Sequence, residues 1–313
     1  MFYTFKLYFY FFNILLNMKN RIRFYYNLND FSLTMINKDI YYFKYQDVFY
    51  SFEKIENIDY LRNVLSILRS IPNSHYFRLV PNIYNDDFCI IDNQKYGLFM
   101  HNAFSFSLFN EIINLPALSY NMSNIRVYPW DFLWIKKINY YEYQVKHIFT
   151  VDTSSIINDC IYYYIGMAEN AISYLKYNSA HFSSKLYLCH KRISMKDFFH
   201  PQNIIIDCYP RDVSEYIKYL FFSNTYQNFS YISFFRVLQF SFNDYILLYS
   251  RLLFPSYFFD VYDDIVNNHS DDVKLKSILL RVNEYNDYLV YIHSIICQFI
   301  EIPEVLWLKR KYL

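Results

Sequence analysis

The residues best suited to chemistry lie in segment 186–215. A strand-like apolar run ends in His190, and a second short run, 203–207, ends in Asp207. Two short strands that carry polar residues between helices are typical of a catalytic hairpin, which is what this segment predicts.

A helix is predicted directly after the second strand. Arg211, Asp212 and Glu215 occupy its first turns, where an acid interacts favourably with the positive end of the helix dipole. We therefore expect these three residues to cap and position the helix rather than to react. His190 can be interpreted in two ways, as a catalytic residue or as a hydrogen-bonded structural histidine at a strand end.

The chain before this segment has the pattern of a small sheet followed by helices. Aromatic and β-branched runs bounded by Asn and Asp predict strands at 21–26, 39–44, 77–83, 88–91 and 96–100. A helix with Leu61, Val64 and Leu68 on one face is expected to extend back toward Asp47. Helical periodicity then predicts helices at 107–115, 131–150, 154–177, 230–254 and 270–301.

These patterns predict an α+β protein with two lobes. The smaller lobe, 18–105, would hold an antiparallel sheet, and the larger lobe, 106–313, would be mainly helical and carry the hairpin. Residues 1–17 are apolar, but they are few for a membrane helix and their basic flank follows them. Three interpretations of this segment remain open: a mis-assigned start, with Met18 or Met35 as the true first residue, a weak membrane anchor, or an ordered packing segment. A membrane partner is not expected.

The order of these features resembles the aminoglycoside-phosphotransferase-like branch of the protein-kinase-like fold. In that fold a strand leads into His-Gly-Asp-x-x-x-x-Asn, and the next strand ends in an Asp that binds Mg²⁺. His190 matches the motif His, Asp207 matches the metal-binding Asp, and Asp212 falls near a later structural Asp.

Further blocks resemble the spore-coat CotS/YutH-type members of that fold, over roughly residues 36–310. They are Trp130-x-x-x-Trp134-x-Lys136-Lys137, Tyr141-Glu142, Gly166-Met-Ala-Glu-Asn-Ala-Ile172, Arg211-Asp-x-x-Glu-Tyr-Ile and Arg251-Leu-Leu-Phe-Pro255-Ser-Tyr. Their shared order carries the resemblance more than any single block does. The resemblance implies a role in the spore coat or in sporulation. The composition by itself does not indicate such a role.

The departures from the motif bear on catalysis. Arg192 stands where the fold has its catalytic Asp, Lys191 replaces the Gly, and Asp197 stands at the place of the Mg²⁺-binding Asn. An always-protonated guanidinium cannot accept the proton of a substrate hydroxyl. Arg192 could instead bind an anion, or pair with Asp197 or Asp207. The resemblance therefore implies a catalytically degenerate, pseudokinase-like protein with a binding or structural role.

An atypical small-molecule phosphotransferase is the alternative. It would use ATP and Mg²⁺ through Asp197 and Asp207, whereas the degenerate protein needs no cofactor. Lys44 could anchor phosphate by pairing with Glu53 or Glu56, although a solvated surface lysine is the simpler interpretation. The chain has 2 glycines where average usage would give roughly twenty, which excludes a glycine-rich phosphate loop.

The overall composition excludes several other classes of function. The 30 basic and 29 acidic residues are scattered, so we expect no nucleic-acid partner. The 5 cysteines form no CxxC pair, which favours free thiols in a reducing, cytoplasmic setting over a zinc site or disulfides. The 37 tyrosines and 32 phenylalanines are what an AT-rich genome encodes. Other coat or cytoplasmic proteins are the expected partners, and the oligomeric state is left open.

Overall fold

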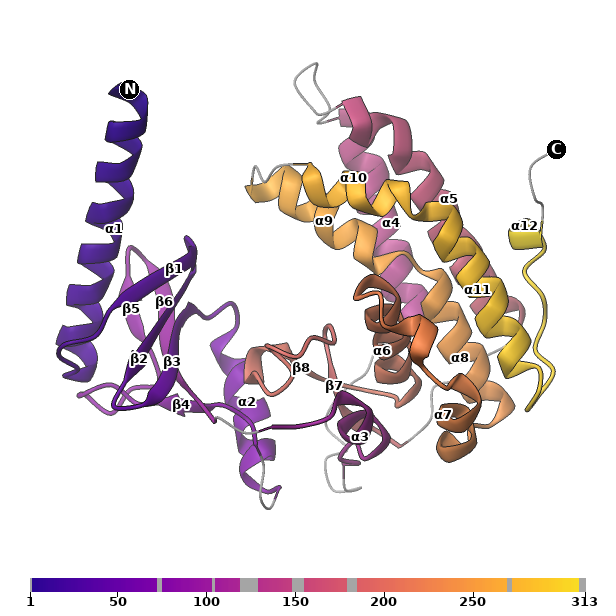
Figure 1. Cartoon of the computed structure of the whole chain (residues 1–313), viewed down its shortest axis with the longest axis horizontal. Helices are drawn as coiled ribbons and strands as arrows, with labels where there is room; N and C mark the ends of the chain where they lie inside the picture. Colours follow the sequence, from indigo (N-terminus) through magenta and orange to yellow (C-terminus); the bar gives the residue numbers. More distant parts are fainter. Residues whose placement is uncertain are drawn as a thin grey trace. The chain divides into compact units, whose positions relative to one another are not determined.

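The structure, a computed structural model, describes residues 2–71, 75–102, 105–118, 129–147, 155–178, 185–268 and 272–309. Figure 1 traces the chain in the order of its elements. Two compact units divide it: residues 1–107 with 195–204 form the first, and residues 108–194 with 205–313 form the second. By its contacts, segment 195–204 therefore belongs with the sheet-containing unit, although it follows the first strand of the hairpin in sequence.

An antiparallel sheet forms the centre of the first unit. Its strand order is β1-β2-β3-β6-β4, and β5 also pairs with β6. The strands are β1 (Leu33–Asn37), β2 (Ile40–Tyr45), β3 (Val48–Lys54), β4 (Arg78–Val80), β5 (Cys89–Ile91) and β6 (Gln94–His101). The β2–β3 and β5–β6 turns have residues at positive φ, Gln46 with Asp47 and Asp92 with Asn93, as two-residue hairpin turns require.

One face of this sheet is covered by helix α1 (Phe2–Tyr26), which Figure 1 shows beside the strands. Met18, Ile22 and Tyr26 lie four residues apart, so they share one helical face, and all three are buried in a core with sheet residues such as Phe52. The predicted strand at 21–26 is therefore wrong. Its aromatic and β-branched residues favour a strand locally, but their spacing lets a helix bury them.

Helix α2 (Ile58–Arg69) packs its predicted apolar face inward and begins at the N-cap Asn57, whose side chain accepts from the backbone N–H of Tyr60. It does not extend back toward Asp47, because β3 occupies that stretch and pairs with both β2 and β6.

The second unit is mainly helical. Its helices are α3 (Leu108–Ile113), α4 (Trp130–His147), α5 (Ser155–Tyr177), α6 (Pro210–Phe222), α7 (Tyr231–Leu238), α8 (Phe242–Leu253), α9 (Ser256–Asn268), α10 (Val273–Leu280), α11 (Val282–Ile296) and α12 (Leu306–Lys309). Among the residues that the structure describes, no helix combines the length and apolar character needed to cross a membrane.

Both of the longest predicted helices are interrupted. The stretch 230–254 breaks at Gln239, which has a φ of 49°, and Ser241 then opens α8 with a reciprocal capping box to Asp244. The stretch 270–301 breaks at Arg281, between α10 and α11. Apolar periodicity continues through both breaks. It therefore predicts the helices but not the points at which one helix ends and the next begins.

Candidate functional site

The two strands predicted at 186–190 and 203–207 are present. Strands β7 (Tyr187–His190) and β8 (Ile204–Asp207) pair as a two-stranded sheet. The buried thiol of Cys189 approaches the carbonyl oxygens of Asp207 at 3.7 Å and Cys208 at 3.5 Å. The hairpin thus brings the ends of both strands, with His190 and Asp207, to the start of α6.

His190 is held by Asp212. The backbone N–H of His190 donates to Oδ1 of Asp212 at 2.8 Å, and its ring Nδ1 pairs with Oδ2 of the same carboxylate. Both side chains are fully buried. Arg211 adds a hydrogen bond from Nε to the carbonyl oxygen of His190 at 3.1 Å. These contacts position the end of β7 against the first turn of α6.

Asp207 is enclosed by hydrogen-bond donors. Its oxygens accept from the indole Nε1 of Trp130 at 3.2 and 3.0 Å, from the backbone N–H of Cys208 at 2.8 Å and from Nη1 of Arg211 at 3.0 Å. The residue is 4% exposed. A cation at Asp207 would therefore have to displace an ion pair and compete with two neutral donors.

Arg192 pairs with residues that the sequence did not indicate. Its Nη2 donates to Oδ1 of Asp260 on α9 at 2.7 Å while its Nε donates to the other oxygen, a bidentate arrangement. Its Nη1 lies 3.8 Å from Oε2 of Glu215 on α6. The expected pairing with Asp207 is not what the structure has, because Arg211 is the arginine that reaches Asp207.

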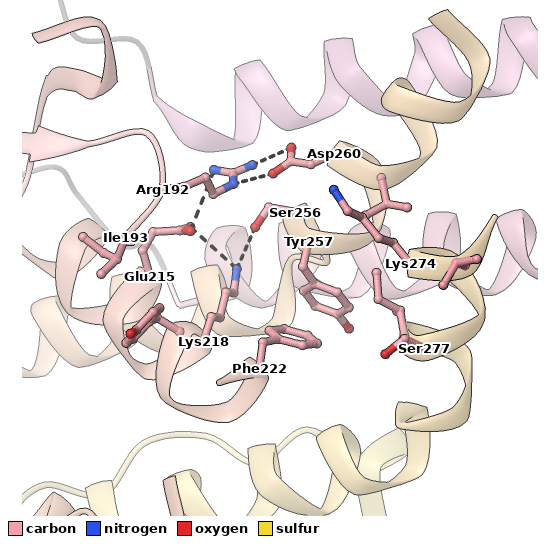
Figure 2. A pocket seen from close by; sticks show the side chains of 14 residues that line it. Arg192, Ile193, Glu215, Lys218, Phe222, Ser256, Tyr257, Asp260, Lys274 and Ser277 are labelled. Atoms are coloured by element: carbon pink, nitrogen blue, oxygen red, sulfur yellow. Dashed lines mark hydrogen bonds and ion pairs between the residues drawn. The ribbon is translucent and has the colours of Figure 1, made fainter. Parts of the chain in front are cut away.

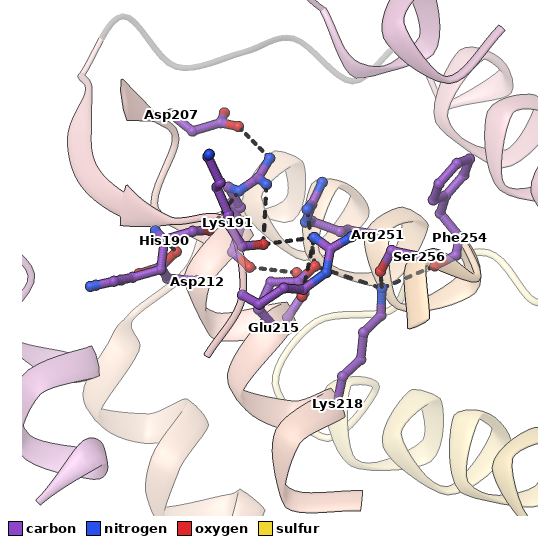
Figure 3. Close-up of polar contacts among 12 residues, drawn as sticks. His190, Lys191, Asp207, Asp212, Glu215, Lys218, Arg251, Phe254 and Ser256 are labelled. Atoms are coloured by element: carbon purple, nitrogen blue, oxygen red, sulfur yellow. Dashed lines mark hydrogen bonds and ion pairs between the residues drawn. The ribbon is translucent and has the colours of Figure 1, made fainter. Parts of the chain in front are cut away.

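Glu215 is the centre of a buried cluster of charges (Figure 3). Its Oε1 lies 2.9 Å from Nη2 of Arg251 and 3.8 Å from Nζ of Lys218. Burial alone would raise the pKa of Glu215, but Arg192, Lys218 and Arg251 together lower it to about 2. Burial lowers the pKa of Lys218 to about 7, despite the neighbouring carboxylate. Nζ of Lys218 also donates to the carbonyl oxygen of Phe254 and to Ser256, each at 3.0 Å.

Asp197 belongs to the first unit rather than to the hairpin unit. Its carbonyl oxygen accepts from the backbone N–H of His200 at 3.1 Å and from Nδ2 of Asn203 at 3.0 Å, so it shapes the turn. Nε2 of His200 lies 3.1 Å from Oε1 of Glu53, and both side chains are buried. Burial would raise the pKa of Glu53, but the hydrogen bond and charge of His200 lower it. A metal site that joins Asp197 and Asp207 stays a prediction.

Lys44 does not form the expected pair with Glu53 or Glu56. It lies on β2 opposite Phe49, and its Nζ contacts Oδ1 of Asp47 at 2.7 Å in an ion pair on the surface. Glu53 faces His200 instead. Glu56 is exposed in the turn that precedes α2. The register of the β2–β3 hairpin, which a sequence pattern does not specify, decides this pairing.

A pocket of about 600 Å³ lies beside the charge cluster, within the second unit (Figure 2). Its charged lining residues are Arg192, Glu215, Lys218, Asp260 and Lys274. Its apolar and aromatic lining residues are Ile193, Tyr219, Phe222, Tyr257, Val261, Val273 and Ile278. Ser256 and Ser277 complete it. Part of the predicted hairpin site, Arg192 with Glu215, thus forms one wall of a real cavity.

Sequence reasoning missed the residues that complete this site. Asp260 carries no motif, and the only signal was its place in an acidic run on an amphipathic helix with Asp263 and Asp264. Lys218 could have been noted because it lies three residues after Glu215 on the same helical face. Among the described residues, no group of three or more His, Cys, Asp or Glu side chains is arranged to hold a metal ion.

Comparison with known protein families gives a match over most of the chain. A family model described as "Spore coat putative kinase YutH" matches residues 19–290. The endospore coat-associated protein YutH of Bacillus subtilis is 26% identical over 216 residues, which cover 59% of this chain and 62% of that protein. The chain therefore matches less than two thirds of the length of this curated relative.

Solved structures were compared with this chain as well. A crystal structure of an aminoglycoside phosphotransferase from Alicyclobacillus acidocaldarius has a TM-score of 0.56 and 10% identity, covering 85% of this chain and 92% of that chain. A spectinomycin phosphotransferase in complex with ADP and spectinomycin has a TM-score of 0.45 and 9% identity, covering 76% of this chain and 88% of that chain. The first of these confirms the predicted α+β, protein-kinase-like fold, with an antiparallel sheet in one unit and mainly helices in the other.

Proposed function

The chain belongs to the YutH family of spore-coat proteins with a kinase-like fold, and from that membership we propose that it is a non-catalytic member. It serves as a binding or structural component associated with the spore coat, and it uses neither ATP nor Mg²⁺. The name of the Bacillus subtilis relative, an endospore coat-associated protein, supports the location. Its partners are then other coat proteins, or cytoplasmic proteins before the coat assembles.

The observation that carries the loss of catalysis is the enclosure of Asp207. A carboxylate that binds Mg²⁺ needs lone pairs free for the metal, and phosphoryl transfer depends on that metal to neutralise developing charge. At Asp207 the lone pairs accept from Trp130, Cys208 and Arg211. The guanidinium of Arg211 already supplies the positive charge that a bound cation would bring.

Arg192 supports the same proposal. The group at its position in an active kinase-like enzyme must accept or orient a hydroxyl proton, and a guanidinium does neither. Its bidentate pair with Asp260 and its proximity to Glu215 also hold it away from a role in turnover. A binding protein tolerates such an internal ion pair, whereas an enzyme would need the site open.

Nucleotide binding tests the proposal directly. We expect no rise in melting temperature when ATP with Mg²⁺ is added at millimolar concentration, because only a ligand that binds the native state stabilises it. The measurement is a thermal shift on the full chain, with and without Mg²⁺. Asp159, exposed on α5, provides the matched control for Asp207.

One outcome would replace the proposal with the atypical phosphotransferase. That outcome is a Mg²⁺-dependent stabilisation by ATP that disappears in Asp207→Ala and persists in Asp159→Ala. It would mean that Arg211 leaves Asp207 when the metal arrives, and that Asp207 and Asp197 act as the metal ligands.

A further inference from the structure

The pocket beside Arg192 has the size and make-up of a small-molecule site. Its volume of about 600 Å³ falls in the range of ligand pockets, roughly 300–1,000 Å³. Such pockets have mainly apolar walls and a few placed polar groups. Here α6, α9 and α10 supply the apolar walls, with Phe222, Tyr257 and Ile278 among them. The apolar part of a ligand would lie against these side chains.

The charged lining of the pocket has more basic than acidic side chains. Three cations, Arg192, Lys218 and Lys274, face two acids, Glu215 and Asp260. Figure 2 shows Arg192 against Asp260, and Lys218 close to Glu215 and Ser256. Both acids already have cationic partners, since Arg251 also reaches Glu215 at 2.9 Å and Lys137 lies 3.8 Å from Asp260. Neither acid is left to attract a cationic ligand.

Lys274 differs from the other two lining cations. It is exposed, and within the described part of the chain no acid pairs with it. The next lysine on the same helix, Lys276, does have an acid, because its Nζ lies 2.8 Å from Oδ1 of Asp272. Lys276 does not line the pocket. Lys276, which is paired and does not line the pocket, is therefore a suitable control for Lys274, which lines the pocket and has no acid partner among the described residues.

We propose that this pocket binds a small organic carboxylate, with its apolar body against Phe222, Tyr257 and Ile278 and its anionic head toward Lys274. The proposal rests on the binding role proposed above, since it names the ligand class that such a role would use. Lys274 stabilises the anionic head, while Arg192 and Lys218 remain paired with Asp260 and Glu215.

A matched pair of probes tests whether the pocket prefers a negative or a positive charge on the head group of the ligand. Phenylbutyrate and phenylbutylamine have the same apolar body and opposite charges. We expect phenylbutyrate to bind the full chain with a dissociation constant at least about tenfold below that of phenylbutylamine, measured by isothermal titration calorimetry. Equal affinity, tighter binding of the amine, or no binding of phenylbutyrate at millimolar concentration would each overturn the proposal.

Variants locate the binding. Ser277→Trp fills the pocket from its exposed side and should abolish phenylbutyrate binding, whereas Lys274→Gln should weaken it about three- to fivefold, as expected for a solvent-exposed ion pair. Lys276→Gln is the matched control and should leave the affinity unchanged. Unchanged affinity in Ser277→Trp, with the fold intact by circular dichroism, would place the carboxylate elsewhere and overturn the proposal.

The two proposals fail separately. If phenylbutyrate does not bind and ATP with Mg²⁺ has no effect, the ligand class is wrong and the non-catalytic assignment stands. A Mg²⁺-dependent effect of ATP that needs Asp207 overturns the assignment, whatever phenylbutyrate does.

Discussion

Arg192, which follows β7, and Arg211, on α6, each hold a different carboxylate. Arg211 lies 3.0 Å from Asp207, its partner four residues earlier, while Arg192 reaches across 68 positions to Asp260. Arg211 neutralises the carboxylate of Asp207, which stands where an active relative of this fold would bind a metal. The pair with Asp260 ties β7 to α9 and forms part of the pocket wall. At this scale the site is a network of internal ion pairs.

The most consequential single side chain is Glu215. It is buried among Arg192, Lys218 and Arg251, and removing its charge would leave those cations close together without a counterion. We expect Glu215→Gln to lower the free energy of unfolding by about 3–5 kcal/mol, the usual effect of breaking a buried ion pair. Urea denaturation followed by circular dichroism gives the value.

Glu284 is the control for this prediction. It is exposed and also contacts an arginine, Arg281, at 2.6 Å. Because water reaches the Glu284 carboxylate, Glu284→Gln should change the unfolding free energy by no more than about 1 kcal/mol. Equal effects of the two substitutions would contradict the view that burial makes the Glu215 cluster essential.

At the scale of elements, the two glycines have opposite roles. Gly97 lies on β6, where an added Cβ would stand 2.8 Å from Cδ1 of Ile55 and 2.9 Å from Cδ1 of Leu79. Gly166 lies inside α5, where an added Cβ would meet no atom within 4 Å. The first is needed for the close approach of side chains to the strand, and nothing within the described fold requires the second.

Alanine at these two positions should therefore have effects of opposite sign. Gly166→Ala should stabilise by about 0.5–1 kcal/mol, because alanine loses less backbone entropy in a helix. Gly97→Ala should destabilise by about 1 kcal/mol or more, because the two methyl groups must shift in a packed core. Thermal unfolding of both variants measures the difference. Destabilisation by Gly166→Ala would contradict the open space that surrounds this position on α5.

At the scale of the whole molecule, aromatic residues replace much of the usual aliphatic core. Several buried tyrosines also tie helices together through their hydroxyl groups. The hydroxyl of Tyr249 donates to the carbonyl oxygen of Leu289, that of Tyr285 to Leu252 and that of Tyr288 to Ile217, at 2.9 to 3.1 Å. The tyrosine-rich composition is thus accommodated, since each buried tyrosine brings a hydroxyl group that needs a hydrogen-bond partner.

The pH dependence of stability also belongs to the whole molecule. Burial lowers the pKa of His101 in the first unit from 6.5 to about 4, and the cations around Glu215 in the second unit lower its pKa from 4.5 to about 2 against the effect of burial. At both groups the unfolded chain takes up a proton at higher pH than the folded chain does. Stability should therefore fall as the pH falls from 6.5 to 4, and again from 4.5 to 2.

Unfolding midpoints measured across this pH range check the prediction. His101→Gln should reduce the loss between pH 6.5 and 4, and Glu215→Gln should reduce the loss below 4.5. Stability that rises on acidification, or a dependence unchanged in both variants, would contradict it. Far-UV circular dichroism and tryptophan fluorescence together would reveal whether the two units unfold in one transition.

Local patterns allowed much of the fold to be predicted. The hairpin at 186–207, the apolar face of α2 and most helices of the second unit follow from strand propensity and helical spacing, which act over a few residues. The order of motifs also led to the kinase-like fold, because the spacing between His190, Asp207 and Asp212 reflects how that fold places its strands and helix.

Only the tertiary structure decided which side chains meet. Segment 21–26 became a helix because Ile22 and Tyr26 gain burial against the sheet, which outweighs their preference for a strand. In the register of the β2–β3 hairpin, Lys44 pairs with Asp47 instead of Glu53. Arg192 pairs with Asp260 on α9. The burial and the partners of a side chain depend on which residues pack against it in space. A local sequence pattern does not specify those residues. The sequence alone therefore determined the architecture, and packing determined the chemistry of the site.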